Sequence, residues 1–209
     1  MNLTTALLKE LFPNTPDYWF PVISHWLPAS GIDTPREVAS FLAQMAHESD
    51  EFRQLEENLN YSAKRLMEVW PRLFPSLNFA EKYARNPRLI ANYVYDDANR
   101  PAGAKLGNVY PGDGYAFRGR GTPQLTGRNN YARYGVLAGI DLIKNPALLV
   151  QPDISIRVAC AYWKDVGLDA LDDDNDMRAE TWRINGGEIG LQHRQALFDK
   201  YLKQLEESA

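Results

Sequence analysis

A complete set of N-terminal helix signals, followed by an apolar helix face with a carboxylate at its edge, constrains the fold of this chain more than any other sequence feature. Thr34 is placed to cap the helix, Pro35 to occupy its first position, and Glu37 to complete a capping box. We predict a helix from residue 35 to about residue 53, through VASFLAQMAHESDEF. At helical spacing, one apolar face of this helix comprises Val38, Phe41, Leu42, Met45 and Phe52.

Two glutamates near the end of this helix are candidate acid and base groups. Glu48 borders the apolar face, where loss of solvation would keep its carboxyl group protonated nearer neutral pH, as a general acid requires. Exposure to solvent, or an ion pair with an arginine, is the alternative. Glu57 can share a site with Glu48 only if the helix ends between them, because on a continuous helix they would point to opposite sides. We expect His47, which points away from the apolar face, to form a supporting hydrogen bond or to be exposed.

The rest of the chain also has helical periodicity, and no run alternates as a half-buried strand would. Thr126 is a predicted N-cap for a helix that stops at Gly135, and Asn78 for a short helix that ends before Pro87. Glycine-rich residues 98–121 predict irregular backbone, with at most a small β element near 100–122. Further helices are expected at 88–96, 153–165, 174–184 and 188–206. The sequence therefore predicts a mainly α chain, a single domain over 1–209 with a small helical lobe inserted at about 71–113.

Composition excludes several classes of function. The formal net charge of −4 does not favour nucleic acid as a partner. The one cysteine, Cys160, lies in an apolar helical stretch where a buried thiol is expected, and the three histidines lack metal-ligand spacing, so no metal or organic cofactor is predicted. No apolar run reaches the length of a membrane span, and no signal peptide is recognisable, so we expect synthesis in the cytoplasm and no stable membrane association.

Three blocks of sequence, in this order, carry a resemblance to a known family. They are AHESDEF with ENLNYSA (46–52 and 57–63), FRGRGTPQLTGRNNYARYG (117–135) and INGGEIGLQHR (184–194). Together they resemble glycoside hydrolase family 19, which includes plant-type chitinases and phage lysozymes. The resemblance spans about 45–200, and the short interval between the glutamates fits the phage endolysin branch. It implies a lysozyme-like helical fold with a two-lobe cleft.

The resemblance also implies roles for individual residues. Glu48 would be the general acid, Glu57 the general base, and Thr126 the residue that holds the attacking water. As an N-cap, however, Thr126 would already be bonded to a backbone amide. The positions associated with substrate binding or with support of the acids are Gln124, Asn130, Asn185, Arg194, Tyr61 and Arg118.

The function expected from this reading is hydrolysis of the β-1,4 MurNAc–GlcNAc backbone of peptidoglycan with inversion, for host-cell lysis. The positive charges of Arg118, Arg120, Arg128 and Arg133 would attract the carboxylates of peptidoglycan stem peptides. Alternatively, one of these arginines would pair with a catalytic glutamate. The alternatives are a chitinase, a lytic transglycosylase that needs only one glutamate, and a non-catalytic wall-binding module. We expect a monomer made in the host bacterial cytoplasm, which reaches the periplasmic cell wall through a separate holin-like protein.

Overall fold

The computed structural model describes residues 2–174 and 177–208 and shows a mainly helical chain, as predicted. Contacts divide it into two compact units. Unit 1 comprises Met1–Leu55, Gly121–Gln124 and Leu148–Ala209, and unit 2 comprises Glu56–Arg120 and Leu125–Ala147. The segment 71–113, predicted as a lobe, lies within unit 2. Within the described ranges, no helix has the length and apolar character needed to cross a membrane.

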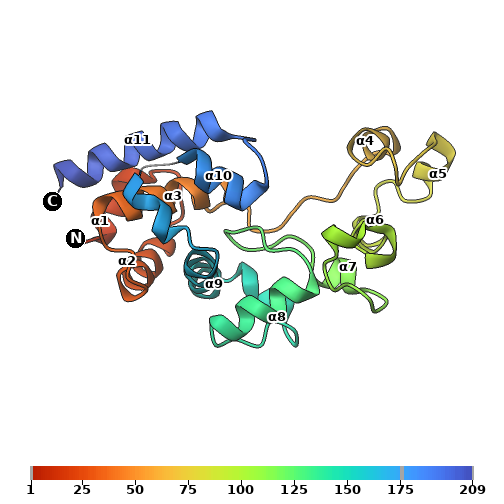
Figure 1. Ribbon diagram of the computed structural model, residues 1–209, viewed down its shortest axis with the longest axis horizontal. Helices are drawn as coiled ribbons and strands as arrows, with labels where there is room; N and C mark the ends of the chain where they lie inside the picture. The colour runs from red at the N-terminus through yellow and green to blue at the C-terminus, as the bar shows by residue number, and fades with distance from the viewer. Residues whose placement is uncertain (1, 175–176, 209) are drawn as a thin grey trace. The chain divides into compact units, whose positions relative to one another are not determined.

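Unit 1 is built around helix α3 (Pro35–Ser49), most of whose residues are buried. Its helices are α1 (Thr5–Leu11), α2 (Trp19–Ala29), α3 (Pro35–Ser49), α9 (Pro152–Asp165), α10 (Met177–Asn185) and α11 (Leu191–Glu207), with the 3-10 helix η4 (Asp169–Asp174). Helix α11 runs alongside α3 (Figure 1). The predicted capping box is confirmed, because Thr34 accepts from the Glu37 amide while the Glu37 side chain accepts from the Thr34 amide. Cys160 is buried, and burial raises the pKa of its thiol to about 11.

The end of α3 differs from the prediction. The helix ends at Ser49, and Asp50, Glu51 and Phe52 all adopt positive φ angles of 51°, 53° and 66°. Left-handed backbone is strained for residues other than glycine. Phe52 offsets that strain by burying its ring against Trp19, 5.2 Å away between centroids. The chain therefore turns after Ser49, the residue that follows Glu48, instead of continuing as a helix.

Unit 2 consists of short helices around an aromatic cluster centred on Phe74, which contacts the rings of Tyr83 and Tyr93. Its elements are α4 (Ala63–Val69), α5 (Leu77–Glu81), α6 (Pro87–Val94), α7 (Asp113–Ala116) and α8 (Arg128–Leu137), with 3-10 helices η1 (Asp97–Asn99) and η2 (Ala102–Ala104). A further 3-10 helix, η3 (Pro146–Val150), spans the junction between the units at residue 147.

Two predicted helix caps are wrong. Helix α5 is capped by Ser76, whose hydroxyl accepts from the Phe79 amide, and not by Asn78. Helix α8 is entered through Gly127 at a φ of +95°, so Thr126 lies outside the helix and does not cap it. This helix also continues past the predicted stop at Gly135 as far as Leu137. Gly127 takes a backbone conformation that a side chain would disfavour, which moves the start of the helix beyond Thr126.

The glycine-rich stretch contains no hairpin. In the part of the chain that the structure describes, the only β pairing consists of isolated antiparallel bridges of Arg120 with Glu56 and with Leu125. Short turns are fixed instead by the Asp97 carboxylate, which accepts from the amides of Leu106 and Gly107. A single buried carboxylate thus organises the loop in place of a strand ladder.

Candidate active site

Glu48 lies in the last turn of α3 and forms an ion pair with Arg194 of α11. The Arg194 side chain is 1% exposed and that of Glu48 17% exposed. The second guanidinium nitrogen of Arg194 donates to Gln44 Oε1 over 2.5 Å. Gln44 and Glu48 can share this arginine because residues four apart lie on one face of a helix. The sequence left open a protonated carboxyl group at the border of the apolar face or, as the alternative, solvent exposure or an arginine pair. The structure shows the arginine pair.

A second buried carboxylate continues this network into unit 1. Glu180 of α10 is 1% exposed and accepts from the Ser40 hydroxyl at 2.6 Å and from Gln44 Nε2 at 2.9 Å. Ser40, Gln44 and Glu48 therefore form a polar stripe along α3, with a spacing of four residues. Sequence reasoning missed Glu180, although the polar stripe was a visible signal of buried partners.

His47 forms a hydrogen bond with His193, with 2.8 Å between the two Nδ1 atoms. Burial, the positive charge of Arg194 and the neighbouring His193 together lower the pKa of His47 to about 4, and burial has the largest effect. The ring occupies the space where a side chain at Gly190 would lie, since a Cβ there would be 2.4 Å from Cε1. His47 is therefore neutral near pH 7 and supports the end of α3.

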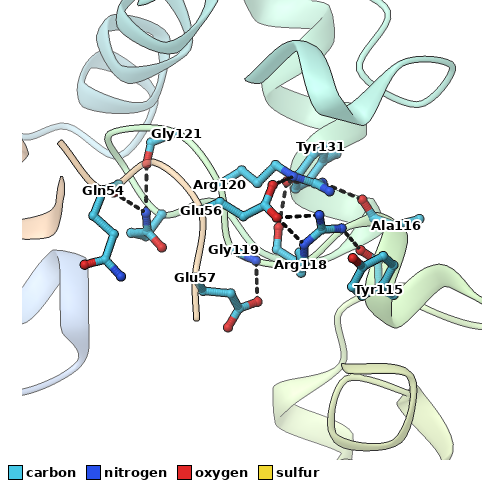
Figure 2. Close-up of polar contacts among 11 residues, drawn as sticks. Gln54, Glu56, Glu57, Tyr115, Ala116, Arg118, Gly119, Arg120, Gly121 and Tyr131 are labelled. Atoms are coloured by element: carbon cyan, nitrogen blue, oxygen red, sulfur yellow. Dashed lines mark hydrogen bonds and ion pairs between the residues drawn. The ribbon is translucent and has the colours of Figure 1, made fainter. Parts of the chain in front are cut away.

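Glu57 belongs to unit 2, where two donors hold its carboxylate. The Tyr95 hydroxyl donates to Oε2 and the Gly119 amide to Oε1, each over 2.6 Å (Figure 2 shows the Gly119 bond). Burial raises the pKa of Glu57 above its ordinary value, although both donors and the charges of Arg118 and Arg120 act in the opposite direction. A carboxylate with a raised pKa is a stronger base. This geometry suits Glu57 to accept a proton.

The arginines around Glu57 form ion pairs with a different glutamate. Arg118 and Arg120 both bind Glu56, at 2.5 Å and 2.8 Å, and the Arg118 guanidinium also lies 3.9 Å from the centroid of the Tyr115 ring. Arg128 pairs with Asp113 at 2.6 Å. The predicted cluster of basic residues is therefore largely neutralised by local carboxylates. Arg118, expected to bind substrate, has its guanidinium engaged within unit 2.

The remaining predicted site residues lie in turns and at helix ends. Gln124, at a φ of +46°, donates to the Gly121 carbonyl, and Asn185 ends α10 and donates to the Ile189 carbonyl. Asn130 donates to the carbonyl of Thr126 over 2.8 Å. The Tyr61 ring packs edge-on against Trp70. Among the described residues, no group of three or more histidine, cysteine or acidic side chains is arranged to hold a metal ion.

No family model matches the chain, but individual proteins do. It is 36% identical over 198 residues to a glycosyl hydrolase family 19 domain-containing protein of Haemophilus influenzae, covering 95% of this chain and 94% of that protein. It is 33% identical over 129 residues to endochitinase 1 of Theobroma cacao, covering 61% of this chain but only 32% of the endochitinase.

Solved structures share the fold at low sequence identity. Chitinase C of Streptomyces griseus aligns with a TM-score of 0.65 at 19% identity, covering 98% of this chain and 92% of chitinase C. A class IV chitinase of Zea mays aligns with a TM-score of 0.59 at 17% identity, covering 99% of this chain and 92% of that protein.

Proposed function

The chain belongs to glycoside hydrolase family 19, and on that premise we propose that this hydrolase is a lysozyme that cleaves peptidoglycan between N-acetylmuramic acid and N-acetylglucosamine. The proposal extends to a role in host-cell lysis. The enzyme would be made in the bacterial cytoplasm and act as a monomer on the periplasmic wall after a holin-like protein permeabilises the membrane.

The mechanism that we propose is a single displacement. Glu48, ion-paired with Arg194 in the free enzyme, takes up a proton before it acts and gives this proton to the glycosidic oxygen. The buried Arg194 guanidinium then stabilises the anion to which Glu48 returns. Glu57, oriented by Tyr95 and Gly119, takes a proton from the water that attacks the opposite face of the sugar. Thr126 would hold that water. Inversion requires carboxyl groups roughly 6.5–9.5 Å apart.

A pocket in unit 2 with two arginines in its lining is the observation that favours peptidoglycan over chitin. It has a volume of about 410 Å³, and its lining includes Trp70, Arg72 and Arg100. Over residues 2–174 and 177–208, neither arginine forms an ion pair; Arg100 bonds only to main-chain carbonyls. Two uncompensated guanidinium groups attract the carboxylates of peptidoglycan stem peptides, whereas chitin carries no charge.

Chitin hydrolysis is the second candidate. It is favoured by the endochitinase among the relatives and by the chitinases that share the fold. Both substrates are β-1,4 chains that contain N-acetylglucosamine, so the catalytic groups alone do not discriminate between them.

Lysis assays with two variants test the proposal. Wild-type protein should clear outer-membrane-permeabilised Gram-negative cells, and Glu48→Gln should reduce the rate by at least ~100-fold, within the range that general acid catalysis supplies. Arg72→Gln should slow cleavage of peptidoglycan but leave cleavage of chitin oligosaccharides unchanged. Lysis by a folded Glu48→Gln variant at the wild-type rate would remove Glu48 from the mechanism. Equal effects of Arg72→Gln on both substrates would remove the argument for peptidoglycan.

A further inference from the structure

Two adjacent glutamates, Glu56 and Glu57, have opposite environments. Figure 2 shows the Glu56 carboxylate directed at Arg118 and Arg120, and Glu57 directed at the Gly119 amide. The two arginines hold the pKa of Glu56 below its ordinary value against the effect of burial, whereas burial raises that of Glu57. The structure thus favours the charged form of Glu56 and suits its sequence neighbour Glu57 to accept a proton.

Glu56 binds the two arginines with both of its oxygens. Oε1 accepts from Arg118 Nη2 at 2.5 Å and Nε at 3.0 Å, and Oε2 accepts from Arg120 Nε at 2.8 Å. The arginine side chains are only 11% and 5% exposed. Each guanidinium also donates to a main-chain carbonyl of the preceding segment, Arg118 to Tyr115 and Arg120 to Ala116, both over 2.7 Å. The three residues form a closed unit, which we call the Glu56 clamp (Glu56, Arg118 and Arg120).

The residue between the two clamped arginines is the one that binds Glu57. Gly119 donates its amide to Glu57 Oε1 over 2.6 Å and accepts from the Glu57 amide over 3.0 Å. On the far side, the Tyr131 hydroxyl donates to the Arg118 carbonyl over 2.7 Å. Because both neighbours of Gly119 are fixed through their side chains, the direction of its N–H bond is fixed as well.

The clamp also sets the charge around Glu57. Two guanidinium groups close to a buried carboxylate would strongly favour its ionised form and weaken it as a base. The negative charge of Glu56 compensates for part of that field. The charged and titratable groups that act on Glu57 are Arg118, Arg120, Tyr95 and Tyr131, and Glu56 is bound to the two arginines among them.

We propose that Glu56 is a positioning residue for Glu57: by clamping Arg118 and Arg120 it holds the Gly119 amide on the Glu57 carboxylate and screens that carboxylate from two positive charges. This inference rests on the proposed role of Glu57 as the base. It assigns to Glu56 a function separate from contact with the substrate.

Two substitutions distinguish the effect of the Glu56 charge from the effect of the length of its side chain. Glu56→Gln keeps the length of the side chain and removes its charge, so the guanidinium groups of Arg118 and Arg120 should lower the pKa of Glu57. Glu56→Asp keeps the charge but cannot span both arginines, so the Gly119 amide should lose its direction. The control is Glu68→Gln, which removes a carboxylate from an exposed ion pair with Arg65 in the same unit.

The readouts are the titration midpoint of the Glu57 carboxyl carbon by NMR and the kinetics on soluble peptidoglycan fragments. Glu56→Gln should lower the midpoint, and the acid limb of the pH–rate profile should move with it. Glu56→Asp should reduce kcat by ~10-fold, less than the roughly 100-fold or more that complete loss of a general base costs, with little change in KM and a midpoint near wild type. Glu68→Gln should change none of these quantities.

The result that overturns the inference is a Glu57 midpoint that stays the same or rises in Glu56→Gln. If that variant does not fold, Glu56→Asp decides, and an unchanged kcat overturns the inference. Failure of the proposed function is a separate result. A wild-type protein inactive on peptidoglycan would refute the proposed substrate, and an active Glu57→Gln variant would refute the role of Glu57 as base. In either case the NMR titration would still test the clamp.

Discussion

Replacing Arg194 should destabilise the protein far more than replacing an exposed arginine of the same unit. Arg194→Met preserves much of the aliphatic stem but leaves Glu48 without its cation and Gln44 without its donor. Removal of one partner from a buried ion pair costs about 3–5 kcal/mol. The pair of Arg178 with Glu188 is the matched control, because its side chains are 66% and 43% exposed, and an exposed pair contributes about 0–1 kcal/mol.

Thermal and urea unfolding followed by circular dichroism would measure the difference. For a chain of this size, about 1 kcal/mol corresponds to a Tm shift of roughly 2–4 °C. Arg194→Met should therefore lower Tm by ~6–20 °C and Arg178→Met by at most ~4 °C. A double-mutant cycle of Arg194→Met with Glu48→Gln should give a coupling free energy of about 0.5–3 kcal/mol. The corresponding cycle of Arg178→Met with Glu188→Gln should give a coupling near zero. Equal losses for the two arginine variants would refute the assignment of Arg194 as the buried support of Glu48.

Three further predictions concern pH and packing. Burial raises the pKa of Glu57 above 4.5, so Glu57 of the unfolded chain ionises at a lower pH than Glu57 of the folded protein. Glu57→Gln should therefore be more stable than wild type at pH 7. A stability difference that does not shrink as pH falls from 7 towards 4.5 would contradict this. Because the pKa of His47 falls from 6.5 to about 4 on folding, stability should decline as pH falls across that range, and a Tm profile for His47→Gln as steep as that of wild type would rule His47 out as the cause. A Cβ at Gly114 would lie 2.3 Å from the Ala91 carbonyl oxygen, whereas one at Gly103 meets nothing within 4 Å. Gly114→Ala should thus cost about 1–3 kcal/mol in urea unfolding and Gly103→Ala much less, and similar midpoints for both would refute the close approach.

Local signals in the sequence were sufficient where structure depends on neighbouring residues. The capping box of Thr34 and Glu37 depends on residues close in the sequence and was predicted correctly. The same holds for the apolar face of α3, apart from Phe52, which lies beyond the end of the helix. The end of α3 was predicted wrongly because Phe52 leaves the helical conformation to pack against Trp19, a contact across the fold.

In the candidate site, too, some features depend on neighbouring residues and others on contacts across the fold. Glu56 and Glu57 are chemically identical neighbours, and only Arg118, Gly119 and Arg120, distant in the sequence, give them different environments. Likewise, nothing local to Glu180 indicates that it binds Ser40 and Gln44. Sequence patterns identified candidate carboxylates, whereas their protonation behaviour depends on partners that only the fold supplies.

Mass spectrometry of the products released from purified peptidoglycan, combined with NMR of their newly formed anomeric centres, tests the central claim most directly. The account predicts fragments that end in reducing N-acetylmuramic acid, formed first as the α-anomer from a β-linkage. Ends in 1,6-anhydromuramic acid would identify a lytic transglycosylase, and a retained β-anomer would require a nucleophile with carboxyl groups ~5–5.5 Å apart. No release from peptidoglycan, with rapid cleavage of chitin, would replace the lysozyme with a chitinase.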